Sequence, residues 1–178
     1  MLEKYVSKGS KKLRCGFTTG TCAAAASAGA ARMLLSGKVI ENITVITPSG
    51  NSVTVGLTDI KKENDYVSCA VQKDSGDDPD VTDKILVYST VSYEKSGITV
   101  DGGEGVGRVT KKGLKQQIGE AAINPVPRKM IEEQLKTAAS DYSYDGGLKA
   151  VISVPMGIQI AKKTFNPRLG IEGGISIL

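Results

Sequence analysis

The chain has 178 residues, of which 40% are hydrophobic and 24% charged, with a formal net charge of +4. These values are typical of a globular protein that buries a core without disulfides or structural metals. Aromatic residues make up only 4% and histidine is absent, which argues against a base-stacking nucleic-acid platform and excludes histidine triads, imidazole bases and histidine metal ligands.

The three cysteines, Cys15, Cys22 and Cys69, are widely spaced and form no Cys-x-x-Cys motif. Neither a zinc site nor a disulfide framework is indicated, and reduced thiols are expected. The first 14 residues are polar and basic without a following apolar stretch, and no run reaches the ~18 apolar residues of a membrane span. We therefore expect a cytoplasmic protein that binds neither a membrane nor nucleic acid.

Residues 1–14 are expected to form an N-terminal arm, loose or partly a short strand, ahead of a single α+β domain over residues 15–178. The alanine-rich stretch from Cys22 to Leu35 predicts a helix, because alanine has the highest helix propensity. Thr19 or Thr21 would cap its start and Gly37 would end it. Its small side chains favour close packing against a sheet.

Runs of β-branched residues predict a hairpin over 43–47 and 52–57, and further strands over 66–72, 85–94, 98–100 and 148–154. Residues 101–120 are glycine-rich and expected to be irregular. Asn124 and Pro125 predict the start of a second long helix that ends near residue 139. A short helix over 158–164 and a final strand-like run complete an α+β fold, in which two main helices pack on one face of a mixed or antiparallel sheet.

The segment from Thr18 to Thr21 contains three threonines and Gly20 at the predicted start of the first helix. Free backbone N–H groups and the helix dipole favour an anion there, and the hydroxyls add donors. A helix cap with additional threonines explains the same residues, and the spacing alone leaves both interpretations open.

An acidic loop follows the strand over 66–72 and contains Asp74, Asp77, Asp78 and Asp80. Its carboxylates could bind Ca²⁺ or Mg²⁺, although the spacing is not that of an EF-hand. If they are unpaired, mutual repulsion raises the pKa of at least one of them, which suits an acid or base. A solvated turn is the alternative.

A glycine loop follows the strand over 98–100 and begins with Asp101 and Gly102. Its acid and glycines are similar to a loop that holds S-adenosylmethionine in doubly wound methyltransferases, but no helix is predicted after it. Glycines allow a backbone to approach a ligand closely. A bulged hairpin is the alternative.

Two Asn-Pro turns are each followed by arginine, at Asn124 to Arg128 and at Asn166 to Arg168. An arginine fixed by such a turn can bind a carboxylate with two parallel hydrogen bonds. Helix capping explains the first pair equally well.

Taken together and in this order, these segments resemble the signatures of the cobalt-precorrin-5B C1-methyltransferase (CbiD) family of cobalamin biosynthesis. The resemblance rests on residues 14–25, 73–82, 101–111, 120–128 and 164–170. Family members are about twice as long, so it implies that this chain is an N-terminal half that lacks a C-terminal domain. The family reaction transfers a methyl group from S-adenosylmethionine to C1 of cobalt-precorrin-5B, with cobalt carried by the substrate and no metal required of the protein.

The resemblance implies three groups of site residues. Carboxylates would take a proton or stabilise charge during transfer to carbon, and the candidates are Asp74, Asp77, Asp78, Asp101 and Glu104. Hydroxyl, amide and guanidinium groups would bind the acidic arms of the substrate, and the candidates are Thr18, Thr19, Gly20, Thr21, Asn124, Arg128, Asn166 and Arg168. The candidates for holding the methyl donor are Gly102, Gly103, Gly105 and Gly107.

Three hypotheses for the chain remain distinguishable by experiment. An enzyme would bind and methylate the corrinoid, a binding module would bind a corrinoid or another anion without reaction, and a structural protein would bind neither. The sequence leaves open the oligomeric state and which half binds S-adenosylmethionine, although the absence of a helix after the glycine loop favours the missing half.

Overall fold

The long helix α1 (Thr19–Ser36) determines the arrangement of the whole molecule. The computed structural model describes residues 5–8, 11–164 and 168–178. The cap of helix α1 is Thr18 and not Thr19 or Thr21 as predicted, because Oγ1 of Thr18 accepts a hydrogen bond from the backbone N–H of Thr21 at 3.2 Å. It ends at Gly37, where φ is 71°. A left-handed residue of this kind is strained for any residue with a Cβ, so glycine ends the helix here, as predicted.

Helix α1 is enclosed on nearly all sides, and 15 of its 18 residues are buried. It packs against the central strands of the main sheet, against helix α2 and against the hairpin that follows it. Gly29 has no Cβ, which leaves room for the side chain of Leu57. A helix can be enclosed in this way only if its side chains are small, so the predicted close packing against a sheet is confirmed.

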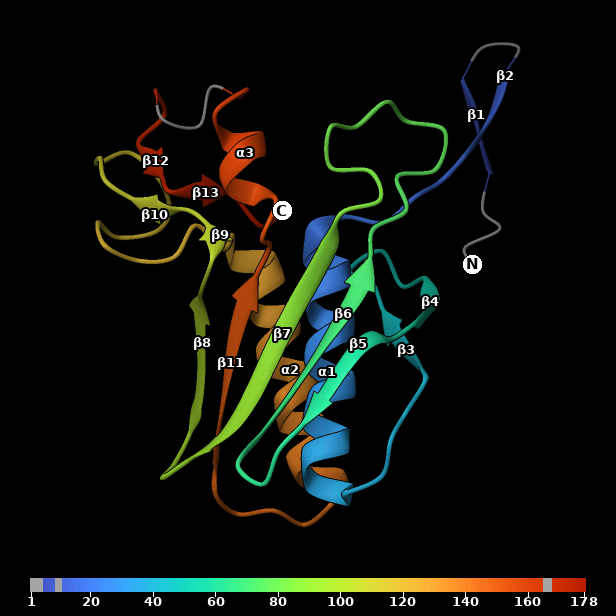
Figure 1. Ribbon diagram of the computed structural model, residues 1–178. Helices are drawn as coiled ribbons and strands as arrows, with labels where there is room; N and C mark the ends of the chain where they lie inside the picture. The colour runs from blue at the N-terminus through green and yellow to red at the C-terminus, as the bar shows by residue number, and fades with distance from the viewer. Residues whose placement is uncertain (1–4, 9–10, 165–167) are drawn as a thin grey trace.

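The main sheet has five strands in the order β5-β6-β7-β11-β8. Its strands are β5 (Thr58–Lys62), β6 (Tyr66–Gln72), β7 (Leu86–Glu94), β8 (Ile98–Gly102) and β11 (Gly147–Ser153). Strands β8 and β11 are parallel, whereas the other neighbours are antiparallel. Helices α1 and α2 cover one face of this mixed sheet, which confirms the α+β class (Figure 1).

Helix α2 (Pro125–Asp141) starts at Asn124 with proline in its first turn, as predicted. The side chain of Asn124 makes no capping hydrogen bond, and its Oδ1 instead accepts one from Nε2 of Gln116 at 2.9 Å. Leu135 and Ile131 are fully buried against α1 and the sheet. The two long helices begin at the same end of the molecule (Figure 1).

The remaining elements are short. They are β1 (Tyr5–Lys8), β2 (Lys11–Arg14), β3 (Asn42–Ile46), β4 (Ser52–Gly56), β9 (Gly105–Val106), β10 (Arg108–Val109), α3 (Gly157–Ala161), β12 (Ile171–Glu172) and β13 (Gly174–Ile175). The β3–β4 hairpin is confirmed. Within the described part of the N-terminal arm, β1 pairs antiparallel with β2.

Three predictions of local structure were wrong. Strand β5 was not expected, because its polar sequence lacks apolar alternation and it pairs through its backbone at the sheet edge. Residues 101–120 are not irregular throughout, since β9 pairs with β13 and β10 with β12. Helix α3 starts and ends earlier than the predicted 158–164.

The loops that carry most of the candidate site residues gather at one end of the sheet, where α1 and α2 begin and β6 ends (Figure 1). Among the described helices, none combines the length and apolar character needed to cross a membrane.

Candidate functional site

Two cavities lie side by side at the N-terminal end of α1 and share residues 15–18 and Leu178 as a wall. The first, of about 690 Å³, is lined by the acidic loop, and we call it the acidic-loop cavity. The second, of about 800 Å³, is lined by the β3–β4 turn, residues 113–116 and the start of α2, and we call it the hairpin cavity. Both have the size of ordinary small-molecule sites.

The shared wall is held by the backbone of the acidic loop. The N–H of Phe17 donates to the carbonyl of Asp74 at 2.9 Å, and Cys15 forms a β-bridge with Gly76. A Cβ on Gly16 would collide with the backbone of Ser75. Glycine at this position therefore lets the wall and the loop lie in direct contact.

The first turn of α1 is hydrogen-bonded to Leu178. The N–H of Gly20 donates to the carbonyl of Leu178 at 2.7 Å, and Oγ1 of Thr19 accepts from the N–H of Leu178 at 3.0 Å. The N–H groups of Thr21 and Cys22 are bonded to Thr18. These three N–H groups of the first turn are therefore satisfied within the protein. The segment contributes to the cavities through its position: Thr18 borders both, Thr19 the acidic-loop cavity, and Gly20 and Thr21 the hairpin cavity.

The carboxylates of the acidic loop are largely paired. Asp74 accepts two hydrogen bonds from the guanidinium of Arg14, at 2.6 and 2.7 Å, and Asp77 accepts one from the backbone N–H of Arg14 at 2.7 Å. The hydrogen bonds from Arg14 hold the pKa of Asp74 well below its usual range. The expectation that repulsion raises a pKa in this loop is therefore wrong for Asp74, because a cation lies closer than the other acids.

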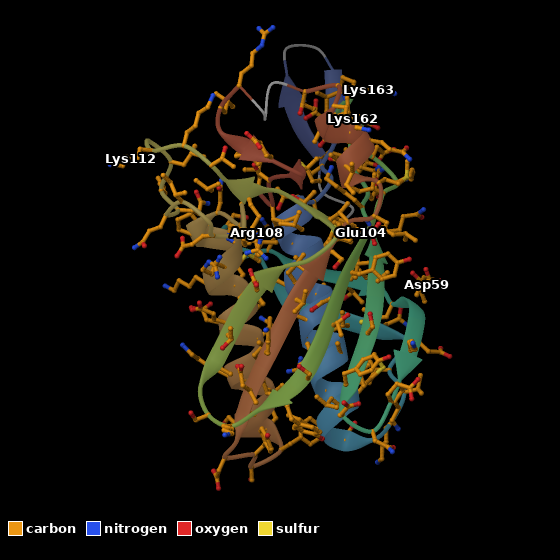
Figure 2. All side chains as sticks on the ribbon, turned by 60° about the vertical axis from the view of Figure 1, so that its left-hand side comes forward. Asp59, Glu104, Arg108, Lys112, Lys162 and Lys163 are labelled. Carbon is orange, nitrogen blue, oxygen red and sulfur yellow. The ribbon has the colours of Figure 1, made fainter. Side chains whose placement is uncertain are left out.

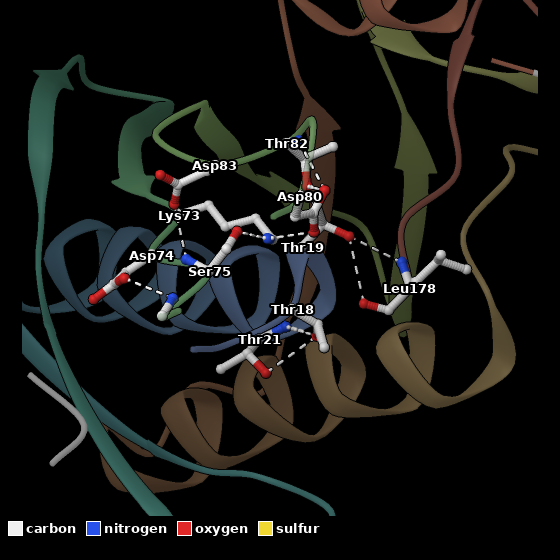
Figure 3. A network of polar contacts seen from close by, with 11 residues as sticks. Thr18, Thr19, Thr21, Lys73, Asp74, Ser75, Asp80, Thr82, Asp83 and Leu178 are labelled. Carbon is white, nitrogen blue, oxygen red and sulfur yellow. Dashed lines mark hydrogen bonds and ion pairs between the residues drawn. The ribbon is translucent and has the colours of Figure 1, made fainter. Parts of the chain in front are cut away.

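A buried lysine, Lys73, directly precedes the first acid of the loop. The side chain of Lys73 is 4% exposed, and its Nζ donates to Oγ of Ser75 and, at 2.8 Å, to Oδ2 of Asp80 (Figure 3). Burial by itself would raise the pKa of Asp80, but the bonds from Lys73 and Thr82 outweigh it and lower the pKa to about 2. Lys73 and Asp80 thus form an ion pair that lines the acidic-loop cavity.

Asp78 differs from its neighbours in the loop. It is exposed and lines the acidic-loop cavity. Within the part of the chain that the structure describes, its carboxylate has no hydrogen bond or ion pair, and only its backbone N–H is bonded, to the carbonyl of Ser75 at 3.3 Å. Asp78 is therefore the candidate carboxylate best placed to meet a ligand in this cavity.

The glycine loop lies apart from both cavities. Oδ1 of Asp101 accepts from Arg108 at 2.7 Å; burial opposes ionisation, but this bond and the N–H of Gly102 lower the pKa of Asp101 overall. The side chain of Glu104 is exposed, and Figure 2 labels both Glu104 and Arg108. Neither candidate carboxylate lines the acidic-loop or the hairpin cavity.

The glycines of this loop make room for the protein's own structure. A Cβ on Gly105, where φ is 74°, would collide with the carbonyl of Val154, and one on Gly107 would collide with Ile171. Gly102 and Gly103 are similarly crowded by neighbouring side chains. None of the four glycines lines either cavity. The close approach predicted for a ligand is made here by strands and loops of the same chain.

In the described residues, the two candidate arginines make contacts within the protein itself. Arg128 donates to the carbonyl of Val100 at 2.6 Å, which ties α2 to β8. Arg168 is exposed, and its carbonyl accepts a bond from Lys111. Neither arginine lines either cavity, whereas Asn124 lines the hairpin cavity. Asn166 lies outside the described residues.

Sequence reasoning did not select Lys73, Lys115 or the β3–β4 turn at residues 47–51, although all line a cavity. A lysine that directly follows an apolar strand and precedes four acids is a usable signal for Lys73, because burial there requires a carboxylate partner. No group of three or more Cys, Asp or Glu side chains suited to a metal occurs among the described residues.

Comparison with known proteins places these features in context. The CbiD family model matches residues 6–178. The chain is 52% identical over 99% of its length to the cobalt-precorrin-5B C(1)-methyltransferase of Ruminiclostridium cellulolyticum, of which it covers 46%. It is 54% identical over 94% of its length to the protein of that name from Geobacillus kaustophilus, of which it covers 45%.

A solved structure shows the same fold. The crystal structure of the cobalamin biosynthesis protein CbiD from Archaeoglobus fulgidus matches 98% of this chain with a TM-score of 0.72 and 38% sequence identity. The match covers 55% of that protein. The chain thus spans about half the length of the curated relatives and of the solved structure that it matches.

Proposed function

The chain belongs to the CbiD family, and we propose that it is the N-terminal part of a cobalt-precorrin-5B C1-methyltransferase. The enzyme would transfer a methyl group from S-adenosylmethionine to C1 of the cobalt-bearing macrocycle. The observation that carries the proposal is the high identity to relatives of this name across nearly the whole chain. The missing part of the enzyme would be the C-terminal half that those relatives possess.

The hairpin cavity supports binding of the macrocycle. Its described lining combines apolar residues such as Phe17, Leu114 and Met130 with hydroxyl and amide groups, and it contains Lys115 but no Asp or Glu. A corrinoid presents an apolar ring with anionic arms. A wide apolar cavity with polar donors and without carboxylates matches this ligand, because no like charge opposes the arms.

The reaction requires little covalent chemistry from the protein. The ring carbon supplies the electron pair for the new C–C bond, the methyl–sulfur bond breaks, and the sulfonium becomes a neutral thioether. The protein must hold donor and acceptor together and stabilise the charge that moves between them. Of the five candidate carboxylates, Asp78 is the one we assign to holding a ligand in place, since Asp74 and Asp77 are bonded to Arg14 and the other two lie away from the cavities.

The test is calorimetric titration of the chain with a cobalt corrinoid that carries free carboxylates, followed by a methyl-transfer assay with labelled S-adenosylmethionine. We expect corrinoid binding that weakens in Lys115→Ala, with Lys136→Ala on the exposed side of α2 as the control. Binding without transfer would support the alternative that this part alone is a corrinoid-binding module. Absence of corrinoid binding would contradict the assignment of the macrocycle to this half.

A further inference from the structure

The ammonium group of Lys73, which lines the acidic-loop cavity, retains a donor without an acceptor among the described residues. An ammonium has three N–H donors, and in the described residues Nζ bonds two acceptors, Ser75 and Asp80. The side chain is 4% exposed and lines the cavity. A buried cationic donor without an acceptor is costly, so its third N–H favours an anionic group that enters from the cavity.

A carboxylate lines the same cavity as this donor. Asp78 lines the same cavity, and its backbone N–H bonds the carbonyl of Ser75, the residue whose hydroxyl accepts from Lys73. Ser75 therefore joins the two groups within one short stretch of loop. The cavity is thus lined by both a cationic donor and an anionic acceptor, a pattern that is complementary to a zwitterion.

The remaining charges of the cavity are neutralised in pairs. Arg14 is bonded to Asp74, and Lys73 to Asp80, which leaves Asp78 as the lining carboxylate without a cationic partner among the described residues. The anionic arms of a corrinoid would be repelled by Asp78, whereas a ligand that adds a second positive charge to an amino-acid zwitterion would be attracted.

We propose that the acidic-loop cavity binds the α-amino-acid end of the sulfonium methyl donor, with Lys73 bonding its carboxylate and Asp78 its ammonium group. This inference rests on the proposed function and assigns the donor to this half of the enzyme, contrary to what the glycine loop suggested. The wall at residues 15–18, shared with the hairpin cavity, then lies between donor and macrocycle. Ligands in these two cavities would lie next to each other, and methyl transfer would then require the reacting carbons to meet at this wall.

The experiment compares two thioethers that differ only in the amino-acid end, S-adenosylhomocysteine and 5′-methylthioadenosine, by calorimetric titration of the chain. We expect S-adenosylhomocysteine to bind at least about tenfold more tightly, since two charge-assisted hydrogen bonds are added. Asp78→Asn and Lys73→Met should each remove about tenfold of its affinity and leave 5′-methylthioadenosine unchanged.

The control is Asp145→Asn, an exposed acid on the α2–β11 connection at the opposite end of the molecule, which should change neither affinity. Because Asp78 is exposed, its variant remains informative even if Lys73→Met fails to fold. Equal affinity for the two thioethers, no binding of either, or an unchanged Asp78→Asn would overturn the inference. Corrinoid binding that depends on Lys115 would still stand in each of those cases, so failure of the inference is separable from failure of the proposed function.

Discussion

Arg14 and Asp74 lie 60 residues apart and form a two-bond ion pair, with N–O distances of 2.6 and 2.7 Å. Arg14 ends the N-terminal hairpin and Asp74 begins the acidic loop. The pair, together with the bond from the backbone N–H of Arg14 to Asp77, fastens the hairpin to the loop beside the shared cavity wall. It therefore couples the shape of the candidate site to the ionisation of one carboxylate.

We expect Asp74→Asn to remove stability that depends on pH. The pKa of Asp74 is lowered in the folded state by the hydrogen bonds from Arg14, so the pair contributes above the unfolded value of about 3.9 and loses its contribution as the pH falls toward the folded value. Urea unfolding at a series of pH values should show the largest difference between wild type and variant near neutrality. The difference should begin to shrink as the pH falls below about 4 and should close only as the pH approaches the folded value. A gap that is constant with pH would show that the ion pair is not its cause.

Ser27 and Ser89 form a buried hydroxyl pair, 2.8 Å apart, between α1 and β7. Ser27 also donates to the carbonyl of Ala23, so its single proton is used there and Ser89 is the donor between the two hydroxyls. Ser27→Ala should cost about 1–3 kcal/mol, because it leaves Ser89 buried without an acceptor, and helix propensity returns only about 0.5 kcal/mol.

Ser89→Ala should cost less, since Ser27 keeps its bond to Ala23, and the double variant should recover part of the Ser27→Ala loss. Denaturant unfolding of the wild type, the two single variants and the double variant gives the free energies of unfolding for this double-mutant cycle. Equal costs for the two single variants would contradict the assigned direction of the hydrogen bond.

Elements with a local cause could be predicted from the sequence. The end of α1 follows from Gly37, and the start of α2 follows from Asn124 and Pro125. The segment that starts α1 was also predicted, although its cap is Thr18 and not Thr19 or Thr21. Pairing across the sheet has no such local signal. Strands β7 and β8 are consecutive and look like a hairpin, but β11 lies between them, because the chain returns through α2 before β11 enters the sheet.

The candidate site was predictable in outline only. The threonine segment and the acidic loop were selected, and both border the cavities. The partners of the acids could not be foreseen, since Arg14 reaches the loop only after the hairpin folds back, and the repulsion argument fails for that reason. The glycine loop has the composition of a ligand loop, but a glycine that accommodates a neighbouring strand looks the same in sequence as one that accommodates a ligand.

Gly105 tests whether the glycine loop is required for internal packing. Gly105→Ala places a Cβ against the carbonyl of Val154 at a φ of 74°, whereas Gly97→Ala places one in open space at a φ of 76°. The second change should cost about 1–2 kcal/mol for the left-handed conformation alone. The first should exceed it by at least about 2 kcal/mol or prevent folding, as thermal or denaturant unfolding would show. Similar costs would mean that the backbone yields and that packing does not determine the glycine.

Cys15 provides a direct chemical probe of the cavities. Burial raises the pKa of the Cys22 and Cys69 thiols to about 12, so they react slowly, whereas the half-buried Cys15 borders both cavities. We expect iodoacetamide to label Cys15 first and the other two only after denaturation, as peptide mass mapping would show. S-adenosylhomocysteine and a cobalt corrinoid should each slow the labelling of Cys15, because either ligand covers one side of the wall. If only one ligand protects, the other does not reach residues 15–18. If neither does, the shared wall is not part of the binding site.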